Sequence, residues 1–252
     1  MDFLHVLEHH LIDQKWGTLQ LGSLAIPFSK HAFLLCSSAV LLTAVIPLLA
    51  RRWQTAHAAS YVPSGSRGLL EIFVMFIRDQ IVIPNMGHEG LKYLPYFLTL
   101  FFFILTSNLI GLIPGSATAT GNISVTAALA VCTLLLMNFA GIREHGFIHH
   151  VKNFVPHGVP GWLAPLVFPL EVIGMFAKAF ALTVRLFANM IAGHIVILAF
   201  LSLIFLVGGV MIIPSVALAL AMMMLELFVC FVQAFIFTFL TSIFVGSTLH
   251  PH

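Results

Sequence analysis

Four charged residues interrupt the apolar carboxyl-terminal part of the chain. Between residues 154 and 252 the only Asp, Glu, Lys and Arg residues are Glu171, Lys178, Arg185 and Glu226. An arginine stays protonated in proteins, so Arg185 cannot become neutral when it is buried. A charged side chain at the centre of a bilayer costs roughly 3 kcal/mol on insertion scales, and such groups usually mark ion or proton paths. Arg185 is therefore the leading candidate for a functional residue.

Helical spacing assigns the candidate residues to faces. Glu171, Lys178 and Arg185 are spaced by seven residues and share one stripe of a helix, which Asn189 extends by one turn. His194 follows Arg185 by nine residues and projects from roughly the opposite face. The sequence holds no carboxylate within two turns of Arg185. Its counter-ion must come from elsewhere in the fold or from another chain.

A carboxylate and a histidine complete a set of groups suited to proton transfer. Glu226 stands among methionine, leucine and phenylalanine residues and needs water or a partner. The imidazole of His194 titrates near neutral pH, which suits a proton relay. Gln233 follows Glu226 by seven residues, on the same helix face. The alternative for Asn189 is a hydrogen bond that only holds neighbouring helices together.

The composition is that of a polytopic membrane protein. The 252 residues are 60% hydrophobic and 8% charged, whereas soluble domains have about 25% charged residues. The net charge of +2 is too small to indicate a nucleic-acid partner. The cysteines Cys36, Cys132 and Cys230 fall in apolar stretches, so we expect no disulfide framework. The polar first thirty residues do not have the pattern of a secretory signal peptide.

Hydropathy and charge predict an all-α fold with three conventional spans, an interfacial helix and a carboxyl-terminal helical hairpin. The apolar runs of the conventional spans are 31–50, 93–113 and 123–141. The predicted segments are an outer amino-terminal segment with a short amphipathic helix at Leu4–Ile12 (1–30), the first span (31–52), an inner loop with an interfacial amphipathic helix at 69–84 (53–90), a two-span hairpin (91–142), an inner loop (143–161) and a long helical hairpin that carries the proton path (162–252).

Basic residues predict the orientation. Arg51-Arg52 follow the first span, and Arg143 and Lys152 follow the third. The loop at 114–120 has no Lys or Arg, as expected on the outer side. Together these positions predict that the amino terminus lies outside.

The last two apolar blocks allow two interpretations. Residues 163–207 and 210–249 are each about 40 residues long, which as one helix is about 60 Å, twice the hydrocarbon thickness. Each block could hold two short spans or one long, steeply tilted helix. The sequence pattern permits both.

The motif Arg185-Leu-Phe-Ala-Asn189-Met-Ile-Ala-Gly-His194, with Gln233-Ala-Phe-Ile-Phe after it, resembles subunit a of the F-type ATP synthase. The resemblance extends to His9-His10, Thr106–Pro114 and Asn122–Thr126, and so to nearly the whole chain. It implies the second interpretation above, a hairpin of two long helices lying nearly flat in the membrane against a rotating ring of c subunits.

The resemblance also implies a function. The chain would be the stator that provides two proton half-channels, with Arg185 facing the carboxylate of each passing c subunit. It would have no catalytic site and no cofactor, because ATP is made on other subunits. The implied partners are the c-ring, the b subunit of the peripheral stalk, the remaining ATP synthase subunits and membrane lipid. The implied location is a bacterial inner membrane, or alternatively the mitochondrial inner membrane.

Roles for the other candidates follow from the same resemblance. Many bacterial relatives have Glu at the position of His194 and His at that of Glu226, and the exchange suggests that the two act jointly at the outer half-channel. Gln233 and Asn189 would shape the hydrogen bonding around Arg185. The polar lining of the inner half-channel would include Glu171 and Lys178, and the outer channel would include Asn122, where some relatives have aspartate.

Two other classes of membrane protein are weaker interpretations. A stand-alone proton- or anion-coupled transporter would predict inverted repeats and broken helices in both halves, which the sequence lacks. A purely structural membrane scaffold does not account for Arg185 and Glu226 together. The stator is therefore the preferred hypothesis.

Overall fold

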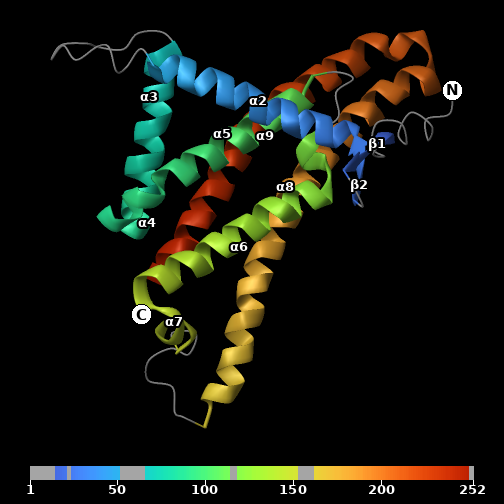
Figure 1. The fold of residues 1–252 in the computed structure, drawn as a ribbon. Coiled ribbons are helices and arrows are strands. Elements are labelled where there is room, and N and C mark those ends of the chain that lie inside the picture. The colour runs from blue at the N-terminus through green and yellow to red at the C-terminus, as the bar shows by residue number, and fades with distance from the viewer. Residues whose placement is uncertain (1–14, 22–23, 52–65, 114–117, 153–161, 250–252) are drawn as a thin grey trace. The chain divides into compact units, whose positions relative to one another are not determined.

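The computed structural model describes residues 15–21, 24–51, 66–113, 118–152 and 162–249 (Figure 1). The predicted amphipathic helix at Leu4–Ile12 and the pair His9-His10 lie outside the described residues. So do Arg52 and most of the loop expected after the first span.

Helices dominate the described chain, as the fold class predicts. The elements, in chain order, are β1 Lys15–Leu21, β2 Leu24–Ser29, α2 Lys30–Arg51, α3 Ser66–Phe76, the π-helix η1 Ile77–Val82, α4 Ile83–Met86, the 3-10 helix η2 His88–Tyr93, α5 Leu94–Gly111, the 3-10 helix η3 Ala119–Gly121, α6 Ile123–His145, α7 Phe147–Lys152, α8 Ala164–Val207, the 3-10 helix η4 Gly209–Met211 and α9 Ile212–Leu249.

Five segments of the described chain are long and apolar enough to cross a membrane: Lys30–Leu48, His88–Gly111, Ile123–His145, Pro165–Val207 and Gly209–Leu249. The first three contain α2, α5 and α6, where the conventional spans are expected. The chain is a multi-pass membrane protein, and this part of the prediction is confirmed.

A short β-hairpin precedes the first long helix and was not predicted. Strands β1 and β2 pair antiparallel, with Leu21 opposite Leu24 and Lys15 opposite Ser29. Trp, Thr, Leu, Ile and Phe supply the strand propensity of this segment. The mixed composition of 1–30 obscured that signal, because no clear alternation of polar and apolar residues runs through it.

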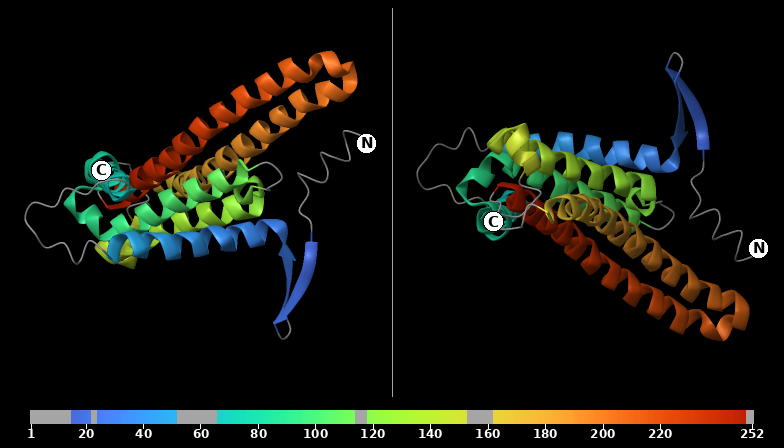
Figure 2. Two further views of the ribbon diagram at one scale, coloured as in Figure 1. Left: turned by 90° about the horizontal axis from the view of Figure 1, so that it is seen from above. Right: turned by 90° about the horizontal axis from the view of Figure 1, so that it is seen from below.

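Each of the last two apolar blocks forms one continuous helix. Helix α8 has 44 residues and α9 has 38, so the structure favours one long helix per block over two short spans. Gly208 separates them with φ of 94°, a conformation that residues with a Cβ rarely adopt. Its N–H donates to the Ile204 carbonyl at 3.1 Å and closes α8. The adjoining parts of α8 and α9 then run antiparallel and side by side (Figure 2).

The chain divides into two compact units. The first comprises Met1–Pro47, Phe102–Thr126 and Val184–Ala234, and the second comprises Leu48–Phe101, Ala127–Thr183 and Phe235–His252. The long helices contribute residues to both units. Arg185, His194, Glu226 and Gln233 all belong to the first unit.

The second unit contains the helix expected at 69–84. In the structure, helical backbone runs from Ser66 to Met86 through α3, η1 and α4. The apolar side chains Ile77, Ile81 and Val82 are fully buried, while Ile72 on α3 is exposed. One face of η1 therefore packs in the unit, while apolar side chains of α3 stay exposed. The place of this segment at a membrane interface stays a prediction.

The α4 segment packs closely against the end of α9. The amide of Asn85 donates to the hydroxyl of Ser242 at 2.9 Å. Gly246 lies against the backbone carbonyl of Asn85 so closely that a Cβ at 246 would overlap the carbonyl oxygen. A backbone atom cannot yield as a side chain can, so the contact requires glycine at this position.

We therefore expect Gly246→Ala to destabilise the protein by about 1–3 kcal/mol through overpacking. Gly174→Ala is the matched control, because an added Cβ there meets nothing within 4 Å. It should be neutral or stabilising, since alanine favours a helix over glycine by about 1 kcal/mol. Thermal unfolding in detergent measures both. Equal midpoints for the two variants would contradict the close packing of Gly246 on Asn85.

Candidate functional site

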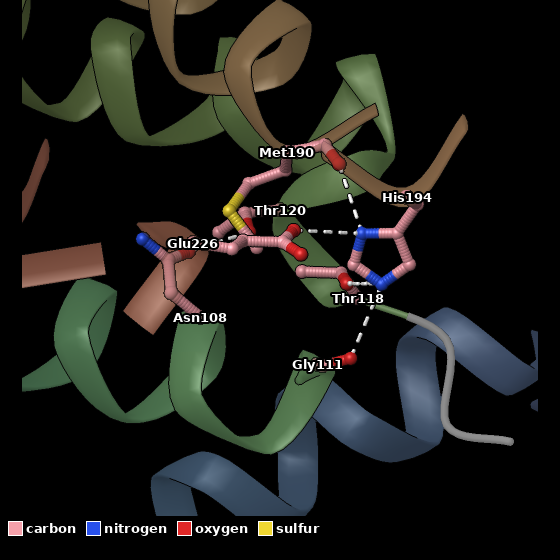
Figure 3. Close-up of polar contacts among 7 residues, drawn as sticks. All are labelled: Asn108, Gly111, Thr118, Thr120, Met190, His194 and Glu226. Atoms are coloured by element: carbon pink, nitrogen blue, oxygen red, sulfur yellow. Dashed lines mark hydrogen bonds and ion pairs between the residues drawn. The ribbon is translucent and has the colours of Figure 1, made fainter. Parts of the chain in front are cut away.

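Glu226 and His194 meet in the first unit, on facing sides of α9 and α8. The Nδ1 atom of His194 lies 3.1 Å from Oε1 of Glu226 (Figure 3). Glu226 is only 3% exposed, so bulk water does not solvate its carboxylate. A buried carboxylate of this kind needs a cationic or hydrogen-bonding partner. His194 is placed to be that partner.

Hydrogen-bond acceptors lie beside both ring nitrogens of His194. Besides Glu226, Nδ1 lies 2.9 Å from the carbonyl oxygen of Met190. On the other side Nε2 lies 3.2 Å from the carbonyl oxygen of Gly111 and 3.0 Å from Oγ1 of Thr118. Carbonyl oxygens only accept hydrogen bonds, and a neutral imidazole has a single N–H to offer. An imidazolium satisfies both carbonyls, with the ionised Glu226 as its counter-ion.

Two glycines make room for this cluster. A Cβ at Gly193 would lie 2.5 Å from Oε1 of Glu226. A Cβ at Gly111 would lie 2.7 Å from Cβ of Thr118 and closer still to its Oγ1. Both distances are shorter than packed atoms tolerate, so the Glu226 carboxylate and the Thr118 side chain occupy space that the missing side chains leave free.

The same region holds buried polar atoms that make no hydrogen bond among the described residues, although the Glu226 carboxylate has His194 as an ion-pair partner. The hydroxyl of Thr120 donates to Oδ1 of Asn108 at 2.7 Å, and both residues are fully buried. In the described part of the chain, Nδ2 of Asn108 and the carboxylate oxygens of Glu226 make no hydrogen bond of good geometry. An unsatisfied buried polar group costs about 1–3 kcal/mol. Water is the partner that such sites ordinarily take up.

The other candidates of the first unit lie apart from this cluster. Arg185 is exposed on α8, and no carboxylate of the described residues pairs with it. Asn189 is half-buried one turn further along. Gln233 on α9 is buried, and its Nε2 has no hydrogen-bond partner among the residues described. Arg185 thus presents its charge outward, without a counter-ion from the described chain.

Glu171, Lys178 and Asn122 have separate surroundings. Glu171 is exposed. In the second unit, Nζ of Lys178 stands 5.5 Å from the ring centre of Phe244, a cation–π contact. Oδ1 of Asn122 accepts a hydrogen bond from the backbone N–H of Ser124 at 2.9 Å and so caps α6.

A histidine outside the candidate set is buried in the second unit. His150 of α7 packs against Gly141, where a Cβ would overlap its ring. Its Nε2 lies 3.4 Å from Oδ1 of Asn138, whose amide donates to the sulfur of Met175 at 3.3 Å. Burial, with a smaller effect from the nearby His145, lowers the pKa of His150. The ring is therefore held in its neutral form near neutral pH.

Comparison with known proteins identifies the family. The family model described as "ATP synthase A chain" matches residues 32–246. ATP synthase subunit a of Myxococcus xanthus is 45% identical over 237 residues, which cover 92% of this chain and 77% of that protein. This chain belongs to the ATP synthase A chain family.

Other bacterial members agree. ATP synthase subunit a of Anaeromyxobacter dehalogenans strain 2CP-C is 45% identical over 241 residues, which cover 93% of this chain and 61% of that protein. The subunit a of Chloroherpeton thalassium is 42% identical over 256 residues, or 97% of this chain and 75% of that protein. The family match includes Arg185, His194, Glu226 and Gln233.

Sequence reasoning did not single out several residues of the His194 cluster. Thr118 and Thr120 lie in the turn before α6, where hydroxyls are common and carry no signal. Asn108 and Gly111 were noted only as part of a motif. The small pair Ala192-Gly193 directly before His194 was the one signal that could have indicated a close helix contact.

Gly193→Ala should displace the Glu226 carboxylate from His194 and destabilise the protein by about 1 kcal/mol. The loss should disappear in a Glu226→Ala background, because no carboxylate remains to be displaced. Thermal unfolding of the two single variants and the double variant in detergent gives the coupling between the two sites. Additive losses would show that the methyl group at 193 disturbs something other than Glu226.

Proposed function

We propose that this chain is the stator subunit of an F-type ATP synthase, which couples proton flow across the membrane to rotation of a ring of c subunits. The observation that carries the proposal is Arg185, which is exposed on an apolar helix without a carboxylate partner in the described chain. A permanent charge in that setting needs water or an anion, and the described chain supplies no carboxylate for it. The family assignment supports a ring carboxylate as that anion.

The fixed charge of Arg185 would act in two ways. It favours the ionised form of a carboxylate brought beside it, so a proton is released there. It also repels protons, so they do not pass directly from one half-channel to the other. Lysine could not replace it fully, because a desolvated lysine can lose its proton and its charge.

His194 and Glu226 would carry protons in the outer half-channel. In the structure Nδ1 of His194 is hydrogen-bonded to the Met190 carbonyl and lies 3.1 Å from Oε1 of Glu226. A small turn of the ring toward the carboxylate would let an imidazolium give its Nδ1 proton to Glu226, which leaves a neutral imidazole and a carboxylic acid. The oxygens of Glu226 and Nδ2 of Asn108 make no hydrogen bond among the described residues, which supports a water molecule at this site.

The remaining candidates would serve the same path. Asn189 and the buried Gln233 would order the hydrogen bonds around Arg185. Glu171 and Lys178, on the stripe of α8 that leads to Arg185, would line the inner half-channel. The amide nitrogen of Asn122 would face the outer mouth while its oxygen caps α6.

The chain would work as one subunit of a larger membrane complex. Catalysis would belong to other subunits of the complex, so this chain would have no catalytic site of its own. Its partners would be the c-ring, the b subunit of the peripheral stalk and lipid. The bacterial relatives support the inner membrane of a bacterium, with the amino terminus outside by the positive-inside rule.

Arg185→Ala should lower ATP-driven proton pumping in inverted membrane vesicles by more than about a hundredfold, because a preorganised charge is lost at the reacting carboxylate. Arg143→Ala is the matched control, since Arg143 is exposed at the end of α6 and has no place in the proposed path. The amount of each variant in the purified complex shows whether assembly is intact. Normal pumping by an assembled Arg185→Ala complex would refute the proposed role.

The exchange of the paired residues tests their joint action. His194→Glu and Glu226→His should each lower pumping by about tenfold, because each leaves two like groups at one site. The double variant restores one carboxylate and one imidazole, so it should pump better than either single variant. A double variant as poor as the product of the two single effects would mean that the residues act independently.

A further inference from the structure

The hydroxyl of Thr118 contacts an ionisable ring, whereas the hydroxyl of Thr126, in the same unit, donates to the Ile123 carbonyl of its own helix. Thr118 precedes η3 and is not in a helix. Its hydroxyl lies 3.0 Å from Nε2 of His194. This hydroxyl therefore forms its contact with the ionisable ring of His194.

A hydroxyl can hydrogen-bond to an imidazole in its protonated and in its neutral form. It accepts a hydrogen bond from the N–H of an imidazolium and donates one to the bare nitrogen of the neutral ring. The backbone carbonyl of Gly111, the other neighbour of Nε2, can only accept. Thr118 is thus the described neighbour of Nε2 that can hand a proton to His194.

Two further contacts hold Thr118 in this position. Its backbone carbonyl accepts a hydrogen bond at 3.0 Å from Nδ1 of His31, in the first turn of α2. Both His31 and Thr118 are only 5% exposed. The Thr118 side chain also fills the space that Gly111 leaves free. Figure 3 shows the Thr118 hydroxyl beside His194 and His194 beside Glu226. His31 holds Thr118 through its backbone carbonyl, so it positions the hydroxyl without contacting it.

We propose that Thr118 is the side chain that delivers protons to His194 in the outer half-channel, and that His31 is the positioning residue that holds it there. This inference rests on the function proposed above. His31 lies one residue before the range 32–246 that matches the family model, so the family assignment does not include it.

The proposed step delivers one proton. A hydrated proton (H3O+) at the outer side gives its extra proton to the Thr118 hydroxyl and is left as neutral water, while the hydroxyl gives its own hydrogen to Nε2 of a neutral His194 that carries its hydrogen on Nδ1, which forms the imidazolium. The imidazolium then gives its Nδ1 hydrogen to the Glu226 carboxylate. One proton enters at the hydroxyl and one proton reaches the carboxyl group, with no net change in Thr118.

The first test compares Thr118→Val with Thr118→Ser. Valine has the shape of threonine without the hydroxyl, while serine keeps the hydroxyl and loses only the methyl group. Thr118→Val should lower ATP-driven pumping in inverted vesicles by about tenfold, and Thr118→Ser should stay within about twofold of the unmodified complex. Thr126→Val, which removes a hydroxyl bonded to its own helix, is the matched control and should pump normally.

The second test compares His31→Asn with His31→Leu, two side chains of similar size. The Nδ2 of asparagine can replace the donor at Nδ1, so His31→Asn should pump better than His31→Leu. Because His31 acts through the hydroxyl, His31→Leu should add little to the loss in a Thr118→Val background. The amount of each variant in the purified complex is measured alongside.

The outcomes separate this inference from the proposed function. Normal pumping by Thr118→Val with none by Arg185→Ala would overturn the role of Thr118 alone. Normal pumping by both would overturn the proposed function as well. Equal losses for Ser and Val at 118 would show that the hydroxyl is not what matters. If Thr118→Val assembles poorly, the two His31 variants provide the test. Equal pumping by His31→Asn and His31→Leu would then overturn the inference.

Discussion

Every charged group placed in apolar helices must find a counter-charge, a hydrogen bond or water, and this requirement shapes the carboxyl-terminal half of the chain. The two groups of the first unit meet it differently. Glu226 is buried and has His194 beside it within the same chain. Arg185 is exposed and has no carboxylate among the described residues. The internal pair suits transfer of a proton within the subunit, and the outward charge suits a partner that the subunit does not contain.

The hairpin turn explains how distant residues form the pair. His194 lies fourteen residues before Gly208, and Glu226 lies fourteen residues after Ile212, where α9 begins. In two antiparallel helices with equal rise per residue, positions equally far from the turn lie at the same level. Gly193 then allows the helices to approach closely enough for the carboxylate to reach the ring. The site thus depends on helix length and on a small residue as much as on its ionisable groups.

The sequence was sufficient for the features that depend on composition and on periodicity within one segment. It predicted the three conventional spans and two further apolar blocks, but it permitted two short spans or one long helix per block, and only the resemblance to the ATP synthase family favoured the long helices. It did not predict the β1–β2 hairpin, because a short segment of mixed composition gives no periodic signal. Nor did it indicate Thr118 or His31, whose contacts with His194 and with each other join residues 76 and 87 positions apart. Such contacts depend on how loops and helix ends pack, and the residues next to each position in the sequence do not predict them.

A density map of the assembled membrane sector tests the central claim most directly, by showing which group lies opposite Arg185. The account predicts a carboxylate of a ring subunit within ion-pair distance of the guanidinium in at least one rotational state, with no carboxylate of this chain beside it. A guanidinium that pairs with a carboxylate of its own chain, or that points to lipid headgroups in every state, would contradict the account.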